Sequence, residues 1–126
     1  MKFSNLLIIN VVVALLFGVG FVLMPATVGS TYGVTPTPAV NLAGQLYGVE
    51  LLAIGLFLWF ARSVEDAYVR RAMCLAFMIA DAIGAVVAAM GVLSGVVNAL
   101  GWSSVLIYAL LALGFAYFQF MQPGSS

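Results

Sequence analysis

Two carboxyl groups stand inside long apolar stretches, Glu50 in the run 40–61 and Asp81 in the run 70–95. A charged group at the centre of a bilayer costs about 2.5–3.5 kcal/mol, so a functional role is the default hypothesis for an acid placed there. Two carboxyl groups that approach each other in a low-dielectric interior resist ionising together, so at least one is expected to hold a proton. Such a pair can relay protons, bind a cation, or only join helices by hydrogen bonds, and all three hypotheses stay open.

Two further polar residues lie at a similar depth in other apolar runs. At 1.5 Å of rise per residue, Glu50 and Asp81 lie ~18 Å and ~15 Å from the charged loop that joins their two runs. On the same scale Asn10 lies ~12 Å from the charged start of the chain, and Tyr108 lies ~16 Å from the polar end of its own run. Asn10, Glu50, Asp81 and Tyr108 are therefore predicted to form one polar layer near mid-membrane.

The elements that position these residues are four apolar runs, at 3–24, 40–61, 70–95 and 102–121. Each is close to the ~20 residues that cross a ~30 Å hydrocarbon core. Each must be helical, because lipid satisfies no backbone polar group. Of the 126 residues, 65% are hydrophobic and 6% are charged, against about 25% charged residues in soluble domains. We predict an all-α protein: a single domain over 1–126, with four transmembrane helices in an antiparallel bundle.

The uncharged segment 25–39 connects the first two runs. Pro25 suits the first position of a helix, and Gly33 is expected to break the turn. A short interfacial helix after the first transmembrane helix, followed by an extended return, is predicted. The segment is interpreted as an interfacial linker, with a lid over a cavity as the alternative.

Small residues at helical spacing mark the faces that are expected to pack closely against other helices: Gly44, Gly48, Gly55, Gly84 and Ala88. Such residues let neighbouring membrane helices approach each other. Glu50 lies on a different face from the glycines, so the second helix is expected to pack by its glycine face and to present Glu50 elsewhere in the bundle. Asp81 lies beside Gly84 and is expected to face protein rather than lipid.

The positive charges predict how the chain crosses the membrane. Lys2 precedes the first run, and Arg62, Arg70 and Arg71 lie between the second and third runs. The other two connections carry no charge. Because lysine and arginine gather in cytoplasmic loops, both termini and the 62–71 loop are predicted to be cytoplasmic. The expected location is the inner (cytoplasmic) membrane of a bacterium, crossed several times.

The composition also argues against several classes of site. The chain has no histidine and one cysteine, Cys74, so no metal site, haem ligand or intrachain disulfide is expected. No phosphate-binding loop and no nucleophile–base pair appears, so no catalytic residues, cofactor or enzymatic activity are predicted. The net charge is zero, which disfavours nucleic acid as a partner. The expected surroundings are the lipid bilayer and either further copies of the chain or the subunits of a larger membrane complex.

Short motifs spread over nearly the whole chain resemble small bacterial four-helix membrane proteins of the DoxX-like type, a group without an agreed activity. The motifs are Leu23-Met24-Pro25, Tyr32-Gly33-Val34, Leu46-Tyr47-Gly48, Gly55-Leu56-Phe57-Leu58-Trp59, Ala61-Arg62, Arg70-Arg71-Ala72, Ser94-Gly95, Asn98-Ala99-Leu100-Gly101-Trp102-Ser103 and Leu113-Gly114-Phe115. The resemblance implies a four-helix bundle with a short surface helix after the first transmembrane helix.

Three functions are compatible with these observations. The leading hypothesis is a membrane protein without catalytic activity that acts as an assembly or accessory subunit, on account of its glycine-rich faces and short loops. The second is a small proton-coupled transporter that uses Glu50 and Asp81, since small multidrug transporters share this size and an intramembrane acid. The third is a binder of a lipid, quinone or pigment, using Phe57, Trp59, Tyr108 and the 25–39 segment.

Overall fold

The computed structural model describes residues 1–121, and this part of the chain contains four helices that are long and apolar enough to cross a membrane. The elements are α1 (Phe3–Leu23), α2 (Pro25–Thr31), α3 (Pro38–Ala61), α4 (Ala67–Leu93) and α5 (Gly101–Ala116), followed by the π-helical turn η1 (Tyr117–Met121). The predicted all-α fold, with four apolar helices and a short helix after the first, is confirmed.

Side-chain caps decide where two of the long helices begin. The Thr37 side chain accepts a hydrogen bond from the backbone N–H of Val40 (3.2 Å), and Pro38 takes the first helical position of α3. The Asp66 carboxylate accepts one from the backbone N–H of Val69 (3.0 Å) at the start of α4. Such caps satisfy N–H groups that the first helical turn leaves open. Because Asp66 caps it, α4 begins at Ala67 rather than near position 70, and the loop before it is shorter than predicted.

The short helix α2 begins at Pro25 and is closed by Gly33, whose φ of 80° lies in the left-handed region that favours glycine. The Val34 N–H then donates to the Gly29 carbonyl (2.9 Å), which turns the chain away from the helix. An extended stretch leads from there to the start of α3.

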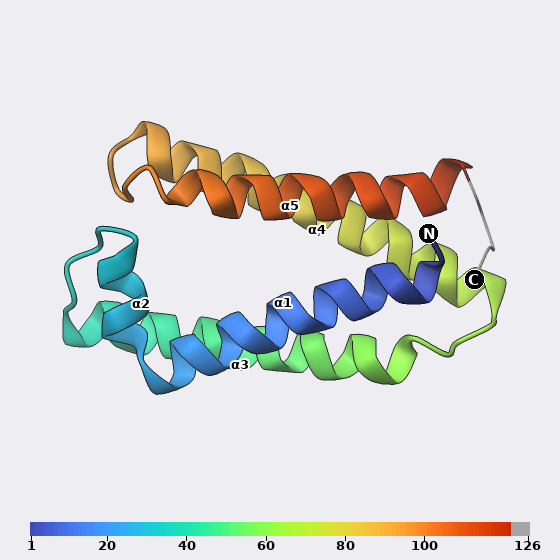
Figure 1. Cartoon of the computed structure of the whole chain (residues 1–126), viewed down its shortest axis with the longest axis horizontal. Coiled ribbons are helices and arrows are strands. Elements are labelled where there is room, and N and C mark those ends of the chain that lie inside the picture. The colour runs from blue at the N-terminus through green and yellow to red at the C-terminus, as the bar shows by residue number, and fades with distance from the viewer. Residues whose placement is uncertain (122–126) are drawn as a thin grey trace.

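The long helices pack in two pairs, α1 with α3 and α4 with α5, which form two layers (Figure 1). Glycine lies at the closest contact in each pair. A Cβ atom on Gly48 of α3 would lie 2.8 Å from the backbone oxygen of Gly18 in α1. A Cβ atom on Gly84 of α4 would lie 2.6 Å from the Tyr108 ring of α5. Both helices therefore approach their neighbours through faces on which no larger residue fits.

The helices α3 and α4, which the loop 62–66 joins, do not pack along their length as an antiparallel pair. The two helices are consecutive in the chain but have no extensive contact, because each belongs to a different pair. The glycine face of α3 is occupied by Leu15 and Gly18 of α1, and the Gly84 face of α4 is occupied by Tyr108 of α5.

The two pairs converge at the end of the bundle that holds the start of α1 and the loop 62–66, here called the core end (Figure 1). Aromatic contacts join helices there: the Phe77 and Phe115 rings stack with centroids 5.3 Å apart, and Phe3 meets Phe118 edge-on at 5.5 Å. The buried apolar side chains of this core come from all four long helices and η1: Phe3, Leu6, Leu7, Val11, Leu58, Ala61, Met73, Cys74, Leu111, Phe115 and Phe118.

At the opposite end, here called the α2 end, the pairs are connected by loops. The backbone N–H of Asn98 donates to the Tyr32 carbonyl (2.8 Å), and its side-chain amide donates to the Thr31 carbonyl (3.0 Å). These bonds attach the end of α2 to the turn between α4 and α5. The bundle is thus joined by apolar packing at one end and by loop hydrogen bonds at the other.

Candidate binding cavity

A cavity of ≈ 660 Å³ lies between the two helix pairs, with walls contributed by α1, α3, α4, α5 and the α2 segment. Its volume falls within the roughly 300–1,000 Å³ of typical small-molecule sites, which are mostly apolar with a few polar groups. Most of the lining is apolar, and the polar side chains in it are Asn10, Tyr32, Tyr47, Asp81, Ser104 and Tyr108.

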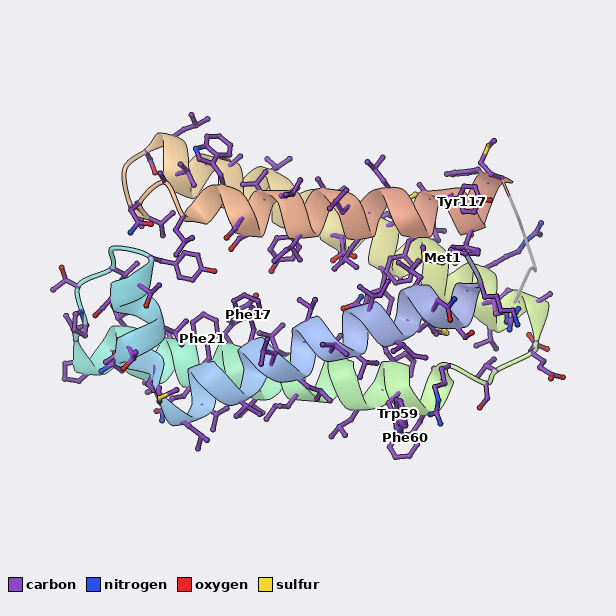
Figure 2. The ribbon with its side chains drawn as sticks, in the orientation of Figure 1. Met1, Phe17, Phe21, Trp59, Phe60 and Tyr117 are labelled. Carbon is purple, nitrogen blue, oxygen red and sulfur yellow. The ribbon has the colours of Figure 1, made fainter. Side chains whose placement is uncertain are left out.

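Aromatic rings form much of the wall. Phe17 and Phe21 point from α1 toward the layer of α4 and α5 (Figure 2). The Phe21 ring meets the Tyr47 ring of α3 edge-on, with centroids 5.1 Å apart. Tyr47 is 42% exposed and Val87 is 61% exposed although both line the cavity, so the cavity opens to the surface of the bundle beside them.

Among the described residues, Asp81 contributes the one carboxyl group in this wall. Its side chain is 8% exposed, and Asp81 lies near the middle of α4 (Ala67–Leu93). Its Oδ2 atom is buried and has no hydrogen-bond partner among residues 1–121. A buried polar atom that makes no hydrogen bond costs about 1–3 kcal/mol, and more for a charged group. A donor bound in the cavity would remove this cost once the carboxyl group turns toward it.

Tyr47 and Tyr108 form a hydrogen bond between their hydroxyl groups, whose oxygens lie 2.8 Å apart. The bond connects α3 to α5 and therefore connects the two helix pairs. The Tyr108 ring packs directly against Gly84, where any larger residue would collide with it. When one hydroxyl donates to the other, the second keeps its own hydrogen available for another acceptor in the cavity.

The structure places three of the four residues of the predicted polar layer in this cavity: Asn10, which is 5% exposed, Asp81 and Tyr108. Glu50 is the exception, because its side chain is exposed on the outer surface of α3 and does not line the cavity. Glu50 and Asp81 therefore do not form the carboxyl pair that was considered from the sequence. The cause is the pairing of the helices, since α3 and α4 do not lie side by side.

Two aromatic residues expected to bind a ligand also lie outside the cavity. Phe57 is exposed, and Trp59 points away from the α4 and α5 layer (Figure 2). The Arg62 guanidinium covers the Trp59 ring at 3.6 Å from its centroid and donates to the Trp59 carbonyl. By contrast Tyr32 and Gly29 of the 25–39 segment do line the cavity, so this segment closes the α2 end.

Sequence reasoning did not select Tyr47 as a site residue. The signal that selected Tyr108 also applies to it, since both are tyrosines inside apolar helices.

Arg70 lies in the first turn of α4, not in the loop where the sequence placed it, and it is buried. Its side chain is 7% exposed, and its Nε donates to the Val64 carbonyl at 2.6 Å. The guanidinium lies 5.3 Å from the centroid of the Phe3 ring. Arg70 thus belongs to the packing of the core end and does not line the cavity.

Within residues 1–121, no group of three or more histidine, cysteine, aspartate or glutamate side chains could hold a metal ion. No protein-family model matches the chain, and neither a curated protein nor a solved structure was found to be similar to it. The cavity itself is therefore the basis for a functional proposal.

Proposed function

We propose that this protein binds a small amphiphilic molecule inside the membrane, in the cavity between the two helix pairs. The observation that carries the proposal is the buried Asp81 Oδ2 atom without a hydrogen-bond partner in the cavity wall. A ligand with an apolar body and one hydrogen-bond donor, such as a hydroxyl or amine, would satisfy this atom while its body fills the apolar space. This role corresponds to the third of the functions considered from sequence.

The opening beside Tyr47 and Val87 supports entry of the ligand from the hydrocarbon phase. Molecules that partition into lipid would reach the cavity without crossing the α2 end. In this proposal the protein spans a bacterial inner membrane with both termini in the cytoplasm, because Lys2 and the arginines of the 62–71 loop lie at the core end.

The single cysteine offers a direct test of binding. Cys74 is buried in the core, so a thiol-reactive fluorogenic dye reports unfolding when it reaches the thiol. The test adds 3,3-diphenylpropan-1-ol or 3,3-diphenylpropylamine to the purified protein in mild detergent during a thermal ramp. At a hundred times the dissociation constant, binding stabilises the folded state by about 2.7 kcal/mol. We expect at least one of the two compounds to raise the unfolding temperature.

A pair of matched variants locates the binding site. Ala88 lines the cavity, so Ala88→Phe fills part of it, whereas Ala82 is exposed and lies outside the lining. The ligand effect should disappear in Ala88→Phe and persist in Ala82→Phe. If neither compound stabilises the parent protein, or if Ala88→Phe responds as the parent does, the cavity is not the site of binding.

A second candidate function is assembly with another copy of the chain, and Glu50 is the observation that favours it. A carboxyl group exposed near the middle of an apolar helix is costly in lipid. Glu50 stands in a row of exposed side chains along one side of α3: Ala43, Leu46, Glu50, Ala53 and Phe57. In a two-fold symmetric pair each residue near the axis meets its own copy, so the two Glu50 side chains would lie together in the interface instead of facing lipid.

The oligomeric state in lipid nanodiscs tests this second function. The parent protein should form dimers, and Glu50→Leu should shift the population toward monomers, whereas Glu65→Leu in the loop 62–66 should not. A monomeric parent protein would remove the support for self-assembly.

A further inference from the structure

We infer that the ligand of the cavity is an amphiphile that carries a protonated amine, which binds with its ammonium group at Asp81. The inference rests on the proposed function and adds the chemical class of the ligand. Asp81 is the one carboxyl group in the lining of the cavity, and within residues 1–121 no lysine, arginine or histidine lines it. The protein itself therefore provides no positive partner for this carboxylate.

The burial of the Asp81 carboxyl group and the missing partner of its Oδ2 atom favour an ammonium over a neutral donor. The Oδ2 atom is unpartnered and almost wholly enclosed, while Asp81 as a residue lines the cavity, so a donor in the cavity reaches this atom once the carboxyl group turns toward the space. An ammonium group brings several N–H donors together with a compensating charge, and charge-assisted hydrogen bonds are about twice as strong as neutral ones. A hydroxyl provides one donor and leaves the charge of a carboxylate uncompensated in a low-dielectric site.

The aromatic wall suits the same class of ligand. A cation is attracted to the face of an aromatic ring within about 6 Å of its centroid, and more strongly where water is excluded. The rings of Phe21, Tyr47, Phe77 and Tyr108 line the cavity together with Asp81. The hydroxyl oxygens of Tyr47 and Tyr108 add acceptors for the remaining N–H groups. The apolar remainder of the cavity accommodates the hydrocarbon part of the ligand.

A matched pair of probes tests the inference. 3,3-Diphenylpropylamine is protonated near pH 7, and 3,3-diphenylpropan-1-ol has the same body with a hydroxyl in place of the ammonium. Dissociation constants are obtained from the concentration dependence of the unfolding temperature, read through Cys74 as above. We expect the amine to bind the parent protein about tenfold or more tightly than the alcohol, as a charged hydrogen bond in a buried site implies.

Two variants then assign the preference to the carboxylate. Asp81→Asn keeps the shape but loses the charge, so the amine should bind it no better than the alcohol does. Asp81→Glu keeps the charge and should retain a preference for the amine. The comparison of the two probes on the parent protein needs no variant, so it remains decisive if Asp81→Asn does not fold.

The outcomes separate the two proposals. Equal or tighter binding of the alcohol to the parent protein would overturn the ammonium assignment while leaving the cavity as a binding site, and Asp81 would then act as a neutral acid. An undiminished preference for the amine in a folded Asp81→Asn variant would also overturn it. If neither probe binds, the proposed function fails together with the assignment.

Discussion

The hydroxyl oxygens of Tyr47 and Tyr108 lie 2.8 Å apart, and the hydrogen bond between them connects the two helix pairs across the cavity. Among residues 1–121, the other side-chain hydrogen bond that connects the pairs comes from Asn98 at the α2 end. The tyrosine pair therefore holds the pairs at a defined separation between the core and the loops.

Removal of either hydroxyl should lower stability by a similar amount. Tyr47→Phe and Tyr108→Phe each lose the shared bond, and such bonds in membrane proteins contribute about 0.6 kcal/mol on average and up to about 1.7 kcal/mol. The double variant should be no less stable than the less stable single one, because the bond can be lost only once. Thermal unfolding followed through Cys74 measures this, with the 81% exposed Tyr68→Phe as control. Additive losses would show that the hydroxyls act separately.

Gly48→Ala should separate α1 from α3. The added methyl group would lie 2.8 Å from the Gly18 backbone oxygen, which cannot move unless the helix moves. Overpacking of this kind costs about 1–3 kcal/mol, more than the gain of up to about 1 kcal/mol in helix propensity. At Gly91 the nearest atom would be a Val97 methyl carbon at 3.8 Å, so Gly91→Ala is the matched control and should be neutral or stabilising. Equal unfolding temperatures for the two variants would refute the contact.

Arg70→Met should destabilise the core end more than Arg71→Met. Arg70 is buried and donates to the Val64 carbonyl, whereas Arg71 is exposed. Loss of a hydrogen bond from a charged group costs about 1.5–3 kcal/mol when the buried acceptor is left unpaired. The measurement is again the unfolding temperature, and both variants remove one positive charge from the first turns of α4. Equal losses of stability in the two variants would show that the lost positive charge, and not the burial of Arg70, determines the stability of the core end.

Cysteine labelling should report which side of the membrane each end faces. Thr35 and Glu65 are exposed at the α2 end and the core end respectively, and the native Cys74 is buried. In intact bacterial cells an impermeant maleimide should label Thr35→Cys at once and Glu65→Cys only after the membrane is permeabilised, because arginine-rich loops stay in the cytoplasm. The reverse pattern would invert the proposed orientation.

Helix positions and much of the close packing could be predicted from single residues. Pro25, Gly33 and the four apolar runs mark elements that the structure contains. Gly48, Gly55 and Gly84 also lie where another helix comes closest. These predictions succeed because a glycine or a long apolar run determines the local structure almost independently of the rest of the fold.

The partners of each face could not be predicted in the same way. The spacing of glycines shows that a face of α3 is smooth, but it does not say whether α1 or α4 covers it. Whether Glu50 lies beside Asp81 depends on that choice, and it is α1 that covers the glycine face of α3. The cavity was also beyond local reasoning, because it results from two pairs that converge at one end, and no segment encodes such a space.

The placement of the apolar core at one end has a mechanical consequence. Phe3, Leu7, Leu58 and Phe115 hold the helix pairs together there, while loops and one tyrosine pair hold them elsewhere. A change in the separation of the pairs is therefore expected to be a hinge rotation about the core end. Such a rotation changes the cross-sectional area of the protein in one leaflet and hardly at all in the other. In a bilayer, the energy of such a rotation would therefore depend mainly on the lateral pressure in the leaflet at the α2 end.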